Sequence, residues 1–123
     1  MAVILVIEDE PPILVLTESV LQQAGYETLT ASTLAEAQSI IHSAPKIDLV
    51  FTDVSLGEDH EGGLQVGHVI RQTSPETPVV YTSARGLTDG MKSLFVERSS
   101  FLPKPYTNEQ LVEVVASLLR EEK

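Results

Sequence analysis

The 123-residue sequence contains no cysteine. This absence excludes a disulfide framework and a zinc site built on thiolates. No apolar run approaches the roughly 20 residues that a membrane-spanning helix needs. The first ten residues, MAVILVIEDE, lack the basic start and the cleavage site of a secretory signal peptide. We therefore expect a soluble, cytoplasmic protein without a membrane segment.

Basic residues are also scarce. Lys and Arg number 8 against 18 Asp and Glu, which gives a formal net charge of −10. Phosphate backbones repel so acidic a surface, so direct binding to nucleic acid is not expected. Solubility is the simplest explanation of the charge. The three histidines have no metal-ligand spacing between them, and we assign them no role.

The chain does contain a regular alternation of two hydrophobic periods, in a length typical of one domain. Five short runs are typical of strands: 3–7, 27–31, 48–52, 78–82 and 100–104. Segments with helical spacing follow them, at 13–24, 34–41, 64–70, about 87–97 and 111–119. Strands that alternate with helices predict a parallel sheet covered by helices on both faces.

Residues typical of helix ends stand at the ends of these predicted segments. Pro11 and Pro12 stand where the first helix is expected to begin, and Gly25 follows it as a left-handed cap would. Thr107 or Asn108 can cap the last helix.

The stretch VIEDE sets a buried strand directly against three acids. Crowded carboxylates repel one another unless solvent, a basic side chain or a metal ion compensates. In parallel sheets, ligands gather outside the carboxyl ends of the strands. The residues expected there are Glu8 and Asp9, Asp53, Thr82 and Ser83, and Lys104 followed by Pro105.

Carboxylate oxygens in an open site favour Mg²⁺. We expect Asp9 and Asp53 to be direct ligands and Glu8 to bind directly or through water. Lys104 supplies a fixed positive charge and Ser83 a hydroxyl donor. Together with the metal, these residues could bind an anion. A carboxylate can attack phosphorus to form an acyl phosphate, with the metal and the lysine neutralising the transferring oxygens.

These motifs, in this order and at these strand ends, resemble the receiver domain of two-component response regulators over essentially the whole chain, 1–123. The resemblance implies a flavodoxin-like (βα)5 fold, a doubly wound parallel five-stranded sheet of order 2-1-3-4-5. It implies that Asp53 is the phosphoacceptor in a phosphorelay, that Lys104 is a phosphate ligand, and that the donor is a phosphohistidine. That donor would belong to a sensor histidine kinase or a histidine phosphotransfer protein.

Other positions carry over from the same resemblance. Ala84 matches a small residue that leaves room for the phosphoryl group, and the backbone carbonyl of Ser55 matches a metal ligand. Phe101 matches an aromatic switch residue that moves inward as Ser83 shifts toward the phosphoryl group. A downstream protein target would then bind the surface formed by the fourth helix, the fifth strand and the fifth helix.

Two features depart from the family pattern. Glu8 stands where an Asp is common, and the loop after Asp53, VSLGEDHEGGLQVG, is longer and more acidic than usual. Its glycines lack the Lys-Ser/Thr ending of a phosphate-cradling loop, so nucleotide binding has no support.

Simpler or different readings stay open beside this one. Lys104 alone could be a surface lysine, and Phe101 alone a core residue. An Asp-nucleophile, Mg²⁺-dependent phosphatase would also use Asp53, but Ser55 stands where that chemistry places a second Asp, and no cap domain is present. A non-phosphorylated receiver-like scaffold would have no need of the unsatisfied charge.

We therefore expect no enzyme beyond the chain's own phosphoryl transfer and dephosphorylation. We expect no effector domain in this chain, which is either a stand-alone receiver or a piece of a larger regulator or hybrid kinase.

Overall fold

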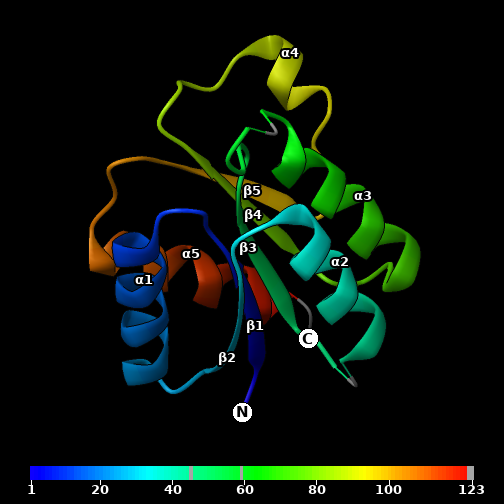
Figure 1. Ribbon diagram of the computed structural model, residues 1–123. Coiled ribbons are helices and arrows are strands. Elements are labelled where there is room, and N and C mark those ends of the chain that lie inside the picture. Colours follow the sequence, from blue (N-terminus) through cyan, green and yellow to red (C-terminus); the bar gives the residue numbers. More distant parts are fainter. Residues whose placement is uncertain (45, 59, 122–123) are drawn as a thin grey trace.

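The computed structural model describes residues 1–44, 46–58 and 60–121. Strands and helices alternate along the chain (Figure 1). The strands are β1 (Val3–Ile7), β2 (Glu27–Ala31), β3 (Leu49–Asp53), β4 (Val79–Ser83) and β5 (Ser99–Pro103). The helices are α1 (Pro11–Gln23), α2 (Leu34–Ser43), α3 (Gly62–Thr73), α4 (Asp89–Lys92) and α5 (Asn108–Glu121).

The strands form one parallel sheet in the order β2-β1-β3-β4-β5. The predicted order 2-1-3-4-5 and the doubly wound, flavodoxin-like architecture are confirmed. Strands β3, β4 and β5 each lie one residue from the predicted bounds, a shift that places Asp53 and Ser83 at the last positions of their strands.

Helices α1 and α5 cover one face of the sheet, and α2 and α3 cover the other (Figure 1). Side chains alternate between the two faces along each strand because the strand period is two. In β1, for example, Ile4 and Val6 pack with α1 and α5, whereas Leu5 and Ile7 pack with α2 and α3. This alternation also fixes the face on which each residue of a strand end projects.

The predicted helix boundaries hold at three places. Pro11 is the first residue of α1, where a missing N–H costs little. Gly25 has a φ of 99°, a backbone conformation that favours glycine. The Thr107 hydroxyl accepts a hydrogen bond from the Gln110 N–H at 3.0 Å and so caps α5.

The prediction of a fourth helix over 87–97 is wrong in extent, because α4 covers only Asp89–Lys92. Thr88 caps its start, and its end coincides with a change of hydrogen-bond partner. The Val96 N–H, which a longer helix would direct to Lys92, donates to the Tyr81 hydroxyl at 3.3 Å. The ring of Phe95 stacks on Tyr81 at 4.1 Å between centroids. The apolar residues Phe95 and Val96 therefore pack against the core although they are not in a helix.

None of the helices in the described ranges combines the length and the apolar character that crossing a bilayer requires.

Candidate functional site

Three carboxylates meet at the carboxyl edge of the sheet. Glu8 and Asp9 directly follow β1, and Asp53 ends the neighbouring strand β3. One oxygen from each lies within 4.8 Å of the others. Glu8 is 1 % exposed and Asp53 is 7 % exposed. The structure thus brings together the acids that the sequence analysis placed at a common edge.

Lys104 forms ion pairs with two of these acids. Its Nζ lies 2.8 Å from Glu8 Oε1 and 2.9 Å from Asp53 Oδ2. The backbone N–H of Lys104 donates to the carbonyl of Ser83, which continues the pairing of β5 with β4 by one residue. The lysine is therefore held at the strand end and reaches back across the edge toward β3 and β1.

The buried Glu8 carboxyl has an unusual affinity for its proton. Burial raises the pKa of Glu8, the hydrogen bond from Lys104 opposes this, and the charge of Asp53 adds to the rise, so that the pKa moves from 4.5 to about 7. Burial alone would lower the pKa of Lys104, but hydrogen bonds to Glu8 and Asp53 outweigh it and raise that pKa. Lys104 is therefore a fixed cation among acids whose mutual repulsion it relieves only in part.

The loop between β3 and α3 is tied to the acids by backbone N–H groups. Ser55 N–H donates to Asp53 Oδ1 at 3.3 Å, and Gly57 N–H donates to Asp9 Oδ2 at 2.8 Å. Gly57 has a φ of 62°, so a side chain there would be strained. At the start of α3, a Cβ on Gly63 would lie 1.9 Å from the Asp53 carbonyl oxygen. Gly57 is thus explained by its positive φ, and Gly63 by the close approach of the Asp53 backbone.

Arg85 joins this loop to the end of β4. Its Nη2 donates to Ser55 Oγ and to the His60 carbonyl, each at 3.3 Å, and its backbone N–H donates to Ser83 Oγ at 3.0 Å. Sequence reasoning missed Arg85 and Gly57, because neither belongs to a periodic pattern or a strand end. Among the described residues, His60 takes part through its backbone carbonyl.

The other predicted residues lie around the same edge. Ser83 is buried and Ala84 is exposed. Phe101 is half-buried on β5, and its ring centroid lies 6.0 Å from that of Phe95, which stacks in turn on buried Tyr81. The carbonyl of Ser55 follows Asp53 by two residues, at the start of the loop described above.

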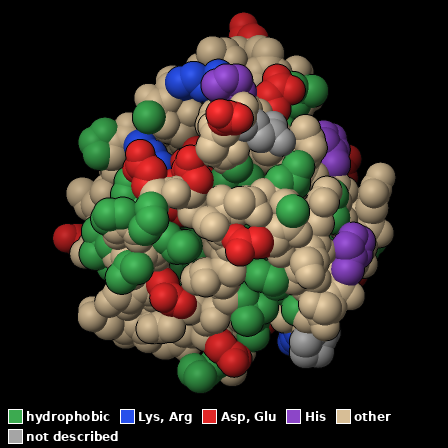
Figure 2. Space-filling model, in the orientation of Figure 1, with side chains coloured by type: hydrophobic (Ala, Val, Ile, Leu, Met, Phe, Trp, Pro, Cys, Tyr) green, Lys and Arg blue, Asp and Glu red, His purple; other side chains and the backbone are tan. Residues whose placement is uncertain are grey.

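An apolar surface lies beside the acidic edge. Val15 and Leu16 on α1 are 63 % and 56 % exposed, although both are large apolar residues. Figure 2 shows hydrophobic side chains gathered over α1, with acidic side chains at its upper end. Scattered apolar residues are ordinary on surfaces, but these two lie on the helix that begins two residues after Asp9.

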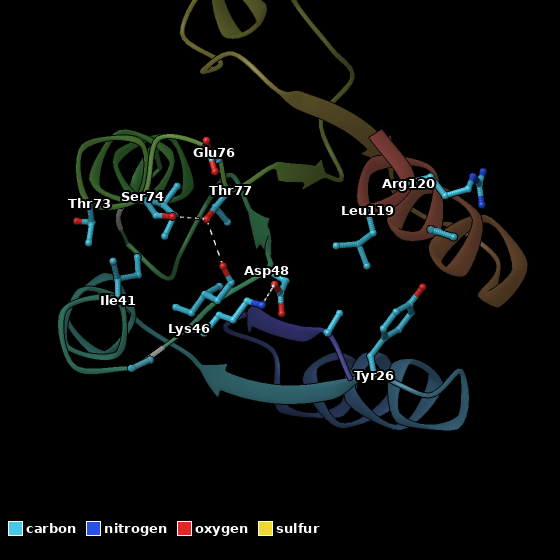
Figure 3. A pocket seen from close by; sticks show the side chains of 15 residues that line it. Tyr26, Ile41, Lys46, Asp48, Thr73, Ser74, Glu76, Thr77, Leu119 and Arg120 are labelled. Carbon is cyan, nitrogen blue, oxygen red and sulfur yellow. Dashed lines mark hydrogen bonds and ion pairs between the residues drawn. The ribbon is translucent and has the colours of Figure 1, made fainter. Parts of the chain in front are cut away.

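A hollow of about 850 Å³ lies at the opposite, amino-terminal edge of the sheet (Figure 3). Lys46 and Asp48 line it and pair at 3.4 Å, and the hydroxyls of Ser74 and Thr77 lie 2.6 Å apart. None of the predicted site residues lines it. The residues predicted to form the site therefore lie at the other end of the strands.

Comparisons with known proteins agree with this geometry. The sequence profile of the response regulator receiver domain matches residues 4–116. Response regulator protein PilR of Pseudomonas aeruginosa is 34 % identical over 117 residues, which are 94 % of this chain and 26 % of PilR. Nitrogen assimilation regulatory protein NtrX of Azorhizobium caulinodans is 30 % identical, again over 94 % of this chain and 26 % of its own length. The chain thus spans about a quarter of the length of these relatives.

A solved structure covers nearly the whole of both chains. The response regulator receiver protein of Sinorhizobium medicae superposes with a TM-score of 0.90 at 34 % identity, covering 99 % of this chain and 97 % of its own.

Proposed function

Because this chain belongs to the response regulator receiver family, we propose that it is a phosphorylatable switch of a two-component or phosphorelay system. Asp53 accepts a phosphoryl group from a phosphohistidine in a sensor histidine kinase or histidine phosphotransfer protein. The modified Asp53 then changes a surface that a downstream protein reads. The single observation that carries this proposal is the pairing of Lys104 Nζ with both Glu8 and Asp53 at the carboxyl edge.

The transfer itself is a displacement at phosphorus. An Asp53 carboxylate oxygen forms the new O–P bond while the P–N bond to the donor imidazole breaks, and the imidazole nitrogen keeps that electron pair. Ser55 N–H and Lys104 orient the Asp53 carboxylate through its two oxygens. As the phosphoryl group arrives, Lys104 is close enough to pair with it, and Ser83 can donate its hydroxyl hydrogen to it. The exposed position of Ala84 leaves this approach open.

The donor set fits Mg²⁺. Three carboxylates converge within 4.8 Å, and oxygen ligands with free positions for water suit this ion. Asp9, Asp53 and the Ser55 carbonyl would hold it. Glu8 would act through water, because its two oxygens already accept hydrogen bonds from Lys104 and from the Glu10 N–H. When bound, Mg²⁺ neutralises negative charge on the phosphoryl oxygens.

The switch follows from contacts that exist only after phosphorylation. Ser83 moves toward the phosphoryl group, and Phe101 moves into the space it leaves. Phe101 stacks with Phe95, so its movement would be felt in the segment that follows α4. We place the downstream protein target on the α4-β5-α5 surface. The exposed Val15 and Leu16 beside the acidic edge support a docking site for the phosphodonor protein on α1.

A phosphatase is the less favoured alternative. Its chemistry needs a general acid two residues after the nucleophile, and Ser55 occupies that position, with its hydroxyl engaged with the His60 carbonyl at 3.1 Å. A receiver domain instead keeps the phosphoryl group on Asp53 as a signal.

The test is incubation with Mg²⁺ and acetyl phosphate, followed by intact mass measurement. We expect one phosphoryl increment in the wild type and none in Asp53→Asn. Glu76→Gln, an exposed acid at the opposite edge of the sheet, is the matched control and should label fully. Full labelling of Asp53→Asn would refute the assignment of the acceptor.

A further inference from the structure

Thr82 carries a buried hydroxyl group without a hydrogen-bond partner. Its side chain is 0 % exposed, and its Oγ1 finds no partner among the described residues. The other buried threonines differ, because Thr17, Thr52 and Thr77 each use their hydroxyl in a hydrogen bond. A buried hydroxyl without a partner destabilises the fold, and an apolar side chain of the same shape would avoid that cost.

The pairing of the strands places Thr82 beside the phosphoacceptor. Thr82 is the partner of Asp53 in the register between β4 and β3. Val80 and Phe51, two residues earlier in each strand, both pack on the α1 and α5 face. Side chains alternate along a strand, so Thr82 and Asp53 project to this same face, on strands about 4.8 Å apart.

Lys104 approaches Asp53 from the strand on the other side of β4. It extends from the end of β5, and its Nζ lies 2.9 Å from Asp53 Oδ2 on β3. Strand β4 lies between these two strands. Leu102, two residues before Lys104, also packs on the α1 and α5 face. The lysine side chain therefore reaches Asp53 past the last residues of β4, at the strand end where Thr82 also lies.

We propose that Thr82 is a positioning residue for the phosphorylated state. When Lys104 moves from Asp53 to the phosphoryl group, the Thr82 hydroxyl donates to the Asp53 oxygen that the lysine leaves. The inference rests on the proposed function, since it requires phosphorylation at Asp53. The hydroxyl is then unsatisfied before phosphorylation and satisfied after it, which biases the equilibrium toward the phosphorylated form.

Three variants separate this role from simple packing. Thr82→Val keeps the shape but removes the hydroxyl, whereas Thr82→Ser keeps the hydroxyl. Thr77→Val is the matched control, because Thr77 is buried at the opposite edge and donates to the Ile47 carbonyl. Two quantities are measured for each variant. The first is the melting temperature in EDTA. The second is the affinity for beryllofluoride in the presence of Mg²⁺, determined from amide chemical shifts.

We expect Thr82→Val to melt about 2–4 °C higher than the wild type, because an unsatisfied group is removed. Its affinity for beryllofluoride should fall about tenfold, the equivalent of one lost hydrogen bond. Thr82→Ser should keep the affinity of the wild type. Thr77→Val should melt lower and bind beryllofluoride normally.

Wild-type affinity in Thr82→Val would overturn the proposal, because the hydroxyl would then make no contact in the phosphorylated state. A lower melting temperature in Thr82→Val would also overturn it, since the hydroxyl would already have a partner before phosphorylation. If the wild type itself neither bound beryllofluoride nor accepted a phosphoryl group, the proposed function would fail instead.

Discussion

Glu8 should make the fold less stable as the pH rises through neutrality in the absence of a divalent ion. Burial raises the pKa of Glu8 from 4.5 to about 7, against the opposing hydrogen bond from Lys104. Between these two values the folded state holds a proton that the unfolded chain has released. Protons therefore favour folding, and the free energy of unfolding falls as the pH rises across this window.

The size of the effect follows from the same two pKa values. One unit of difference corresponds to about 1.4 kcal/mol, so a rise from 4.5 to about 7 amounts to about 3 kcal/mol. Glu8→Gln imitates the protonated carboxyl group and cannot lose a proton. The variant should match the wild type well below the unfolded pKa of 4.5 and exceed its free energy of unfolding by about 3 kcal/mol near pH 8.

Urea unfolding in EDTA at a series of pH values measures this difference directly. Glu36→Gln is a control in which the effect of pH on stability should have the opposite sign. Hydrogen bonds from the backbone and hydroxyl of Ser32 lower the pKa of exposed Glu36. The stability from that group is present above its unfolded pKa and is lost as the pH falls. Parallel pH profiles for the wild type and Glu8→Gln would refute the reasoning, because the buried carboxyl group would then titrate as it does in the unfolded chain.

Three further predictions test other parts of the site. Asp9→Asn should be more stable than the wild type without metal and lose most of the rise in melting temperature that Mg²⁺ produces. Ser83→Ala should still label at Asp53, yet beryllofluoride should perturb the amide chemical shifts of residues 87–106 much less than in the wild type. Gly67→Ala should cost about 1–3 kcal/mol in urea unfolding, because its Cβ would lie 2.1 Å from the hydroxyl of buried Tyr81.

Each of these has a control and a contrary outcome. Glu10→Gln, at an exposed neighbouring acid, should keep the Mg²⁺ response, and an unchanged response in Asp9→Asn would place the ion elsewhere. Equal perturbation by beryllofluoride in Ser83→Ala and the wild type would exclude coupling through Ser83. Gly90→Ala should be tolerated, since no atom lies within 4 Å of its added Cβ; equal stability of Gly67→Ala would show that Tyr81 can move aside.

The sequence predicted the parts of the site that depend on strand ends. Glu8, Asp53 and Lys104 are far apart in the chain, but each follows or ends an apolar run, and parallel strands bring such ends to one edge. The order of the strands came from the family resemblance and not from the periodicity, because alternating strands and helices fit several orders.

Contacts made by loops could not be predicted in this way. Arg85 and Gly57 make hydrogen bonds between loops, and loops have no sequence periodicity. These hydrogen bonds depend on where the sheet positions the ends of the loops. The extent of α4 was overestimated because Phe95 satisfies helical spacing and aromatic stacking equally well. Thr82 was expected at a strand end but received no role of its own, since a missing hydrogen bond leaves no trace in a sequence.

The brevity of α4 has a consequence for the way in which this chain opens locally. A helix of four residues contains few backbone hydrogen bonds, here from Lys92 to Thr88 and from Ser93 to Asp89, and residues 84–90 are exposed. Such a segment opens at a small free energy while the buried strands open only with the whole domain. Its amides should therefore exchange with solvent long before those of β1 or β3. A partner or a phosphoryl group could order this segment without disturbing the core beneath it.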